Sequence, residues 1–424
     1  DWSSDVCSSD PGNPASVDHN LTVDVTVPAV TINTVAGDDV INLAEHSQAH
    51  IISGTATGAA AGDKVTVTIG GQTYTTVLDA AGNWSVGVPA SVIFGLSDGS
   101  VTVTASVTDA AGNTGTGTHN VTVDTGLPSV SFNAISDDNV LNAVEKGQDL
   151  RVSGTSANLA EGTVVAVTLN GKNYTATTAA DGTWSLTVPA ADLAGLGEAN
   201  YILSASATNG VGNSVSNTAN LLVDTALPTV TINTVAGDNV INAAEVAAGQ
   251  TLSGKVANAE AGNTVTVTIG GNRYTATVQN DLTWSVDVPE SVLTALGNGD
   301  LTVTASVTNG VGNSGSAERD ITIDANLPGL RVDTVAGDDV INSIEHGQNL
   351  IVTGSSDGLT AGTTLTVTVN GKTYPATVLA DGTWRAAIPA ADVGALAAGT
   401  VTVTVAGQSA AGNPVTIRDR KSVV

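Results

Sequence analysis

Carboxylate and amide side chains recur in this sequence at a fixed interval of 100 residues. Each set has an aspartate, an asparagine and a glutamate in one short stretch and, in three of the four sets, an aspartate much further along the chain. The sets are Asp38, Asn42, Glu45 and Asp124; Asp138, Asn142, Glu145 and Asp224; Asp238, Asn242, Glu245 and Asp324; and Asp338, Asn342 and Glu345. Hard oxygen donors of this kind suit Ca²⁺, with backbone carbonyls and water as its remaining ligands. The pattern therefore predicts calcium sites.

The same residues also have a simpler interpretation as turn and cap residues. Asp and Asn favour turns because their side chains bond to the nearby backbone. The spacing Asn-x-x-Glu resembles a helix capping box. From these residues alone, both interpretations stay open.

A glycine-containing loop is the second candidate site. It occupies residues 109–113 (DAAGN), with counterparts at 209–213 and 309–313 (NGVGN) and at 409–413 (SAAGN). Its first residue is Asp or Asn in three copies and Ser in the fourth. Such a loop is either an ordinary hairpin turn or a source of one ligand across the junction with the preceding repeat.

All these groups share one frame, because the whole sequence repeats every 100 residues. Tryptophan recurs at Trp84, Trp184, Trp284 and Trp384, and tyrosine at Tyr74, Tyr174, Tyr274 and Tyr374. A repeat of this length can bury its own core, so the sequence predicts an array of similar domains. One Trp and one Tyr per repeat suggest core anchors, with a sugar-stacking platform as the alternative.

Each repeat shows the pattern of about seven short strands. Residues 101–108 (VTVTASVT) alternate apolar and polar side chains, as a half-buried strand does, and Gly70-Gly71 is a hairpin signal. A single helical segment is expected per repeat, at 89–96 in the first, with Pro89 at its first position. The predicted fold class is all-β, a tandem array of Ig-like β-sandwich domains of about 100 residues each.

This topology predicts where the acidic sets lie. The first and last strands of an Ig-like sandwich run in the same direction, so the loop 36–46 lies at the same end as the chain exit, 124–128. We therefore expect each set to gather at the junction with the next repeat. Two carboxylates about 4 Å apart repel by about 1–4 kcal/mol, and a cation would reverse this repulsion and lock the two repeats together.

Composition excludes several function classes. The net charge is −27, from 40 acidic and 13 basic residues, which argues against nucleic acid and anionic membranes as partners. No apolar run approaches the ~20 residues of a membrane span, so membrane insertion is not expected. The five histidines share a register only in the pairs His19 and His119 and His46 and His346, and no nucleophile, base and orienting acid occur together. We expect no enzymatic activity.

The two ends of the chain do not follow the repeat. Residues 1–10 (DWSSDVCSSD) and 418–424 match translated short-read sequencing adapters and are interpreted as assembly artefacts. Cys7, the only cysteine, is then not native, which rules out disulfides and thiolate metal sites. The chain contains no methionine and no signal peptide and is interpreted as a fragment of a longer polypeptide.

The predicted organisation follows from the period. The domains are the tail of an earlier repeat at 11–28, full repeats at 29–128, 129–228 and 229–328, and a truncated fourth repeat at 329–417 whose closing strand is lost before its aspartate.

The motifs VTINTVAGDDVINLAE, SGT, DAAGN and VDTGLP, with the Tyr–Trp pair, resemble the bacterial Ig-like repeats of large type I-secreted, BapA-like biofilm-associated adhesins. The resemblance covers 11–417. It implies an Ig-like sandwich, export by a type I system, calcium-dependent rigidity and a place in an adhesin stalk, at the bacterial cell surface or outside the cell. The implied partners are neighbouring Ig-like repeats of the same longer chain and a distal adhesive domain outside this sequence.

The expected function is therefore a Ca²⁺-stiffened stalk segment that supports cell adhesion and biofilm formation. One alternative is that the repeats themselves bind a glycan or host protein, for which the variable loop 89–100 and the additional Tyr201 are weak indications. Another is self-association between cells through an open sheet edge.

Overall fold

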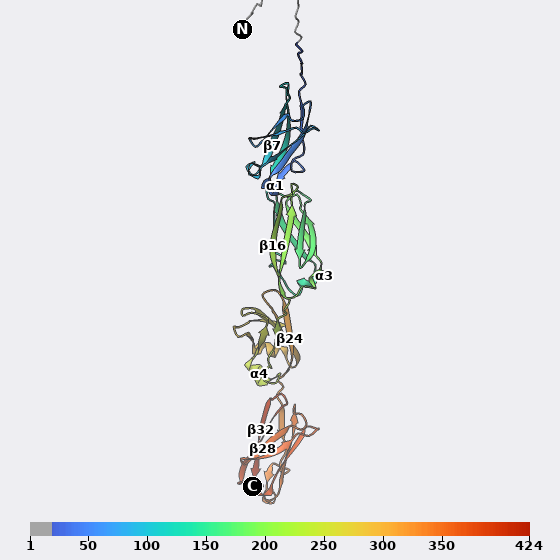
Figure 1. Cartoon of the computed structure of the whole chain (residues 1–424). Helices are drawn as coiled ribbons and strands as arrows, with labels where there is room; N and C mark the ends of the chain where they lie inside the picture. Colours follow the sequence, from blue (N-terminus) through green and yellow to red (C-terminus); the bar gives the residue numbers. More distant parts are fainter. Residues whose placement is uncertain (1–18) are drawn as a thin grey trace, which may run out of the picture. The chain divides into compact units, whose positions relative to one another are not determined.

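A computed structural model describes residues 19–424 of the chain (Figure 1). The predicted adapter segment 1–10 and the beginning of the predicted tail 11–28 lie outside the described residues. The chain divides into two compact units, each described by itself. The first comprises the described residues up to Asn139, with Asp149–Asp192 and Asn200–Leu221; the second comprises Val140–Gln148, Leu193–Ala199 and Leu222–Val424.

The same order of elements occurs four times. The first repeat has β1 (Ala29–Ile32), β2 (Val40–Asn42), α1 (Leu43–His46), β3 (His50–Thr57), β4 (Lys64–Ile69), β5 (Gln72–Val77), β6 (Asn83–Val88), α2 (Ala90–Ile93), β7 (Gly99–Thr108) and β8 (Thr114–Asp124). The second has β9 (Ser129–Phe132), β10 (Val140–Leu141), the 3₁₀ turn η1 (Glu145–Gly147), β11 (Leu150–Ala157), β12 (Val164–Leu169), β13 (Lys172–Thr177), β14 (Thr183–Val188), α3 (Ala190–Leu193), β15 (Ala199–Thr208) and β16 (Ser214–Val223). The third has β17 (Thr229–Val230), β18 (Val240–Asn242), α4 (Ala243–Ala248), β19 (Gln250–Ala257), β20 (Thr264–Ile269), β21 (Asn272–Thr277), β22 (Thr283–Val288), α5 (Glu290–Leu296), β23 (Gly299–Thr308) and β24 (Ser314–Asp324). The fourth has β25 (Gly329–Val332), β26 (Val340–Ile341), η2 (Glu345–Gly347), β27 (Leu350–Asp357), β28 (Thr364–Val369), β29 (Lys372–Thr377), β30 (Thr383–Ile388), α6 (Ala390–Val393), β31 (Gly399–Gln408) and β32 (Pro414–Val423).

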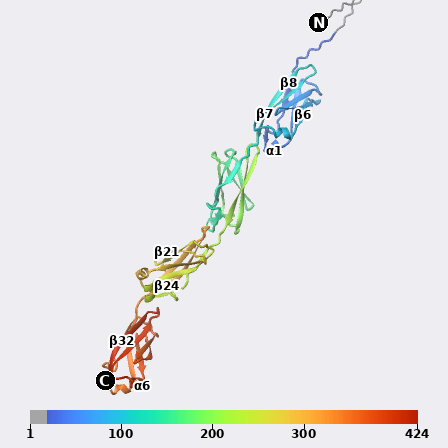
Figure 2. The same ribbon diagram turned by 90° about the vertical axis from the view of Figure 1, so that its left-hand side faces the viewer.

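Each repeat forms one three-stranded and one five-stranded sheet, so the predicted all-β, tandem Ig-like architecture is confirmed. In the first repeat the orders are β1-β3-β6 and β2-β8-β7-β4-β5, and Figure 2 shows β7 and β8 side by side. β2 pairs with the closing strand β8 in parallel, with Asn42 beside Asp124. The loop after the first strand therefore does end beside the chain exit.

Three local features differ from the prediction. A second helical segment, α1, follows β2, because Asn42 and Glu45 form a capping box that starts a helix. Pro89 is the N-cap of α2 and not its first helical residue; its backbone is extended, with φ −63° and ψ 149°. The three-residue strand β2 also adds an eighth strand to the predicted seven.

The core follows the alternation seen in the sequence. In β4 the side chains of Val65, Val67 and Ile69 are buried while the threonines between them are partly exposed. The four recurring tryptophans, Trp84, Trp184, Trp284 and Trp384, are only 1–3% exposed and anchor the cores. The interpretation as core anchors therefore holds, since their ring faces are closed to a sugar.

The recurring glycine of the SGT motif makes this packing possible. A Cβ at Gly54 would lie 1.9 Å from the Thr31 carbonyl oxygen and 2.5 Å from the Trp84 ring. The equivalent positions Gly154, Gly254 and Gly354 are equally crowded, with the carbonyl at 1.8–1.9 Å. Only glycine lets β1, β3 and the tryptophan approach this closely.

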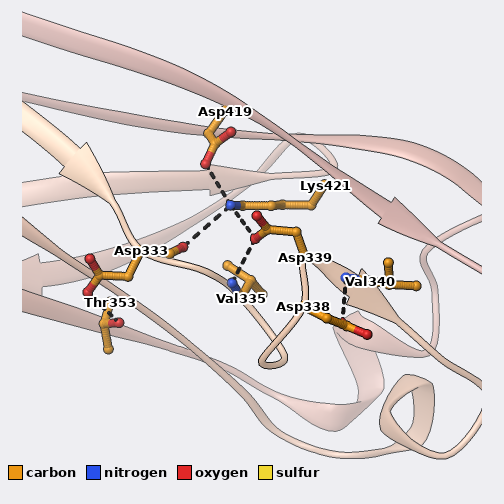
Figure 3. A network of polar contacts seen from close by, with 8 residues as sticks. All are labelled: Asp333, Val335, Asp338, Asp339, Val340, Thr353, Asp419 and Lys421. Atoms are coloured by element: carbon orange, nitrogen blue, oxygen red, sulfur yellow. Dashed lines mark hydrogen bonds and ion pairs between the residues drawn. The ribbon is translucent and has the colours of Figure 1, made fainter.

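The fourth repeat has a closing strand, so the predicted loss of that strand was wrong: β32 extends to Val423. Lys421 occupies the position of Val121, Leu221 and Ile321, which are core residues in the other repeats. Its Nζ lies 2.5 Å from Asp339 Oδ1 and 2.7 Å from Asp419 Oδ2 (Figure 3). Burial opposes the charge, but these two carboxylates outweigh it and raise the pKa of Lys421. A lysine at this core position departs from the pattern of the other repeats; the adapter origin of 418–424 stays a prediction.

Candidate functional site

The first aspartate of each set holds the turn before the short strand. Asp38 Oδ1 accepts a hydrogen bond from the Val40 amide at 3.0 Å. The same bond is made by Asp238 at 2.9 Å and by Asp338 at 3.0 Å, the latter visible in Figure 3. Asp138 also has a polar partner. These carboxylates therefore act as turn residues in the described structure.

The asparagine and glutamate of each set cap the helical turn that follows. Asn42 Oδ1 accepts from the Ala44 and Glu45 amides at 3.0 and 3.1 Å, and Glu45 Oε2 accepts from the Asn42 amide at 3.1 Å. The same reciprocal bonds occur at Asn142–Glu145, Asn242–Glu245 and Asn342–Glu345. Because the single side-chain oxygen of Asn42 already accepts two amides, we assign this residue a positioning role.

The last aspartate of each set lies where the chain leaves the repeat. Asp124 Oδ1 accepts from the Gly126 amide at 3.0 Å, and Asp224 and Asp324 make the equivalent bond at 3.2 Å. The backbone register sets Asp124 beside Asn42, so the two ends of the predicted set do meet.

The donor chemistry of the sets fits Ca²⁺, but the donors are not gathered into a close group. Each of Asp38, Glu45 and Asp124 has a second carboxylate oxygen that accepts no hydrogen bond from the described part of the chain. Among residues 19–424, however, no three acidic, histidine or cysteine side chains come close enough to hold a metal ion. A cation here would rely on fewer carboxylates than predicted, with backbone carbonyls and water as further ligands.

The second candidate loop does reach across the junction, through its last residue. The Leu43 amide of the first repeat donates to Asn213 Oδ1 at 2.8 Å. Asn213 Nδ2 donates in turn to the carbonyls of Asp124 at 2.8 Å and Gly126 at 3.2 Å. Asn213 is 3% exposed. All four residues belong to the first compact unit.

The same arrangement recurs twice within the second unit. Asn313 accepts from the Ala143 amide at 2.8 Å and donates to the Asp224 carbonyl at 2.8 Å. Asn413 accepts from Ala243 and donates to the Asp324 carbonyl, both at 2.7 Å. Both asparagines are fully buried.

The first residue of the loop, which the sequence suggested as the donor, mainly holds the loop itself. Asp109 Oδ1 accepts from the Asn113 amide at 2.8 Å, and Asn209 does the same for Asn213. Only Asn209 also reaches across the junction within the described residues, where its Nδ2 donates to the Gly126 carbonyl at 3.4 Å. The bond from the Asn113 side chain lowers the pKa of Asp109. In the fourth copy Ser409 Oγ accepts from the Asn413 amide at 3.2 Å, so the bond that holds the loop is kept without an acidic or amide residue. The signal that identifies the last residue is its constancy at 113, 213, 313 and 413, where the first residue varies.

Comparison with known proteins agrees with this architecture. The family described as bacterial Ig-like domain matches residues 26–125. No curated protein matches the chain. None of the helices among residues 19–424 is long and apolar enough to cross a membrane.

Three solved structures are similar over most of the chain. A Ca²⁺-stabilised adhesin with which an Antarctic bacterium binds ice is 35% identical, covering 95% of this chain and 100% of its own, with a TM-score of 0.41. A tetra-tandem repeat from the extending region of a large adhesion protein is 29% identical, covering 94% and 100%, with a TM-score of 0.39. A structure from a 1.5-MDa bacterial ice-binding adhesin, concerned with retention at the host cell surface, is 29% identical, covering 71% and 99%, with a TM-score of 0.38. Since 35% identity extends over nearly the whole of both chains, this chain belongs to the bacterial Ig-like repeats of large adhesins.

Proposed function

We propose that this chain is a stalk segment of a bacterial surface or secreted adhesin, stiffened by Ca²⁺ at its junctions, that supports cell adhesion and biofilm formation. The observation that carries the proposal is the junction itself, which is built from equivalent residues three times. A chain with equivalent junctions between its repeats is suited to fix the spacing of those repeats and the length of a stalk. The proposal includes export by a type I system and a distal adhesive domain elsewhere in the longer protein.

The calcium part of the proposal rests on two supports. One is the similarity to an adhesin described as Ca²⁺-stabilised. The other is the surplus of carboxylate oxygens at the end of each repeat, where Asp38, Glu45 and Asp124 lie within one end of the sandwich. Fewer than all three of these carboxylates, together with backbone carbonyls and water, would hold the cation, and Asn42 would position Glu45 through the capping box. Bound calcium would supply charge neutralisation between the exit strand and the helical turn.

Direct ligand binding by the repeats finds less support. The tryptophans that suggested a sugar platform are buried. Self-association would use an edge strand such as β5 or β6, which end the two sheets of the first repeat. In the fourth repeat the equivalent edge strand β29 contains Pro375, a residue that blocks edge pairing.

Small-angle X-ray scattering on the full chain tests the proposal. The particle is measured with about 5 mM Ca²⁺, above the range of about 10⁻⁴–10⁻³ M in which extracellular modules bind, and then in excess chelator. We expect calcium to increase the radius of gyration and the maximum dimension. A variant that keeps shape and hydrogen-bond acceptors but removes the junction charges should lose this response: Asp124→Asn, Asp224→Asn, Asp324→Asn, Glu45→Gln, Glu145→Gln and Glu245→Gln.

A matched control separates the junction from general charge effects. The aspartates of the β13–β14, β21–β22 and β29–β30 turns carry the same charge but bond within their own turns, so Asp181→Asn, Asp281→Asn and Asp381→Asn should leave the calcium response intact. Coincident scattering profiles of the unmodified chain with calcium and with chelator would refute the calcium part of the proposal.

A further inference from the structure

We infer that each junction carries a second fastening that needs no metal: a buried asparagine clamp, formed by Asn213, Asn313 or Asn413, which docks one repeat on the end of the preceding one. The surface that receives the clamp is made of backbone groups at residues 43, 124 and 126 in the first repeat. Its partner is another repeat of this family whose loop ends in Gly-Asn. The inference goes beyond the calcium-stiffened stalk, because it gives the joint a basis independent of the cation.

The clamp uses both ends of one planar amide. Asn213 accepts a hydrogen bond at Oδ1 from the Leu43 amide and donates from Nδ2 to the carbonyls of Asp124 and Gly126. An aspartate would lack the donors, a leucine would lack both functions, and a serine is too short to span them. The arrangement therefore selects asparagine by its chemistry and its length.

The groups that the clamp satisfies have no partner of this kind inside their own repeat. Leu43 is the first residue of α1, and the first amides of a helix have no intrahelical acceptor. Asp124 ends the closing strand β8, where the ladder of backbone bonds stops. Each repeat that is followed by another thus ends in a backbone amide and a backbone carbonyl whose hydrogen bonds are completed by the next repeat.

The glycine before the asparagine contributes to the fit. Gly212 has a φ of +90°, and a Cβ there would lie 3.1 Å from Asn42 Nδ2 of the preceding repeat. Gly312 approaches Asn142 at the same 3.1 Å, and Gly412 approaches Asn242 at 3.5 Å. The Gly-Asn pair therefore packs against the capping asparagine as well as against the backbone, and the positive φ disfavours any residue other than glycine at this position.

The clamp contains no ionised group. Its donors and acceptors are amides and carbonyls, and the side-chain carboxylates of Asp38, Glu45 and Asp124 take no part in it. Removing calcium or adding salt therefore leaves its hydrogen bonds in place. The burial of Asn213, Asn313 and Asn413 at 3%, 0% and 0% exposure also shields them from competition by water.

Hydrogen exchange of the full chain in excess chelator tests the clamp, with the Leu43 amide resolved by fragmentation mass spectrometry. We expect this amide to be protected both with calcium and with chelator. Asn213→Leu, close in size to asparagine, should speed its exchange at least about tenfold. Asn213→Asp keeps the acceptor for Leu43 but loses the donors to Asp124, so it should give an intermediate rate.

Two controls keep the result interpretable. Asn113→Leu replaces the equivalent residue that bonds to the Asp24 carbonyl and should leave Leu43 unchanged. Unaltered exchange of the core amides of β4 and β12 shows that both sandwiches are folded. The inference is overturned if chelator alone deprotects Leu43 in the unmodified chain, or if Asn213→Leu has no effect. Neither outcome depends on the scattering response to calcium, so the two proposals can fail separately.

Discussion

The first and third repeats differ from the second and fourth at one place in the sandwich. In the second repeat this is where β13 meets the short helix α3, which follows Pro189. In the second repeat Lys172 Nζ lies 2.5 Å from Asp192 Oδ1, and Tyr174 OH donates to Asp192 Oδ2 at 2.8 Å. Lys372, Tyr374 and Asp392 form the same triad in the fourth repeat. In the first and third repeats a valine, Val92 or Val292, replaces the aspartate. Each valine packs against the same hydrophobic core as the tyrosine of its repeat.

A second difference follows the same alternation. The indole N–H groups of Trp184 and Trp384 donate to the carbonyls of Thr155 and Ser355 at 3.3 Å. Those of Trp84 and Trp284 are buried and have no hydrogen-bond partner among residues 19–424, and the same holds for the Tyr274 hydroxyl. The same fold thus tolerates either a polar or an apolar contact at this position. The sheets follow a period of one repeat, whereas these polar networks follow a period of two, as does the turn after the short strand, which is helical in α1 and α4 and 3₁₀ in η1 and η2.

The largest expected effect should be the same in both kinds of repeat, because the core is shared. Trp184→Ala and Trp284→Ala each remove a side chain that is at most 2% exposed. We expect each to lower the free energy of unfolding of its own repeat by about 3–5 kcal/mol. Native-state hydrogen exchange of the core amides in β12 and β20 measures the two repeats separately. If one substitution were tolerated and the other were not, the two cores would not be equivalent.

An intermediate effect should separate the two kinds of repeat. Tyr174→Phe removes a hydroxyl that is bonded to Asp192 and should cost its repeat about 1 kcal/mol. Tyr274→Phe removes a buried hydroxyl that has no partner and should be neutral or stabilising. The same exchange measurement on β12 and β20 provides the comparison. Equal costs for the two substitutions would show that the triad adds no stability.

The smallest expected effect concerns the ionisation of Tyr174, which can be measured only at alkaline pH. Burial, followed by the hydrogen bond to Asp192 and its negative charge, raises the pKa of Tyr174 from 10.0 to about 12. Between these values the unfolded chain releases the phenolic proton and the folded repeat retains it. The contribution of this group to stability is therefore complete below pH 10 and is lost as the pH rises towards about 12. Tyrosinate absorbance should show a component near pH 12 that Tyr174→Phe removes; a titration that is unchanged by this substitution would contradict the assignment.

Much of the fold could be predicted from the sequence because strands carry a periodic signal. The alternation in 101–108 and the Gly70-Gly71 hairpin correspond to β7 and to the β4–β5 turn. β2 was missed because a strand of three residues is too short to show a period. α1 was missed because its capping box was considered only as an alternative to metal ligation, although the capping bonds are what the structure shows.

The site was predicted less completely, because its contacts join residues that are far apart in the sequence. The junction was expected at the correct end of the repeat, since the order of strands determines where loop 36–46 lies. The asparagine clamp joins residues 170 positions apart, such as Leu43 and Asn213, and no local pattern marks such a contact. The metal ligation predicted for the acidic sets depends on side-chain directions, which spacing does not determine.

The parallel pairing of β2 with β8 has a mechanical consequence. When a repeat is pulled by its two ends and β1 has separated from β3, tension reaches β2 at its amino end and β8 at its carboxyl end. In parallel strands these are opposite ends of the ladder, so the backbone bonds that join Val40–Asn42 to residues 122–124 are loaded together in shear and do not open one after another. Resistance to force is governed by the rate of unfolding and not by equilibrium stability. A strand of only three residues can therefore determine how well each repeat withstands a pull along its length.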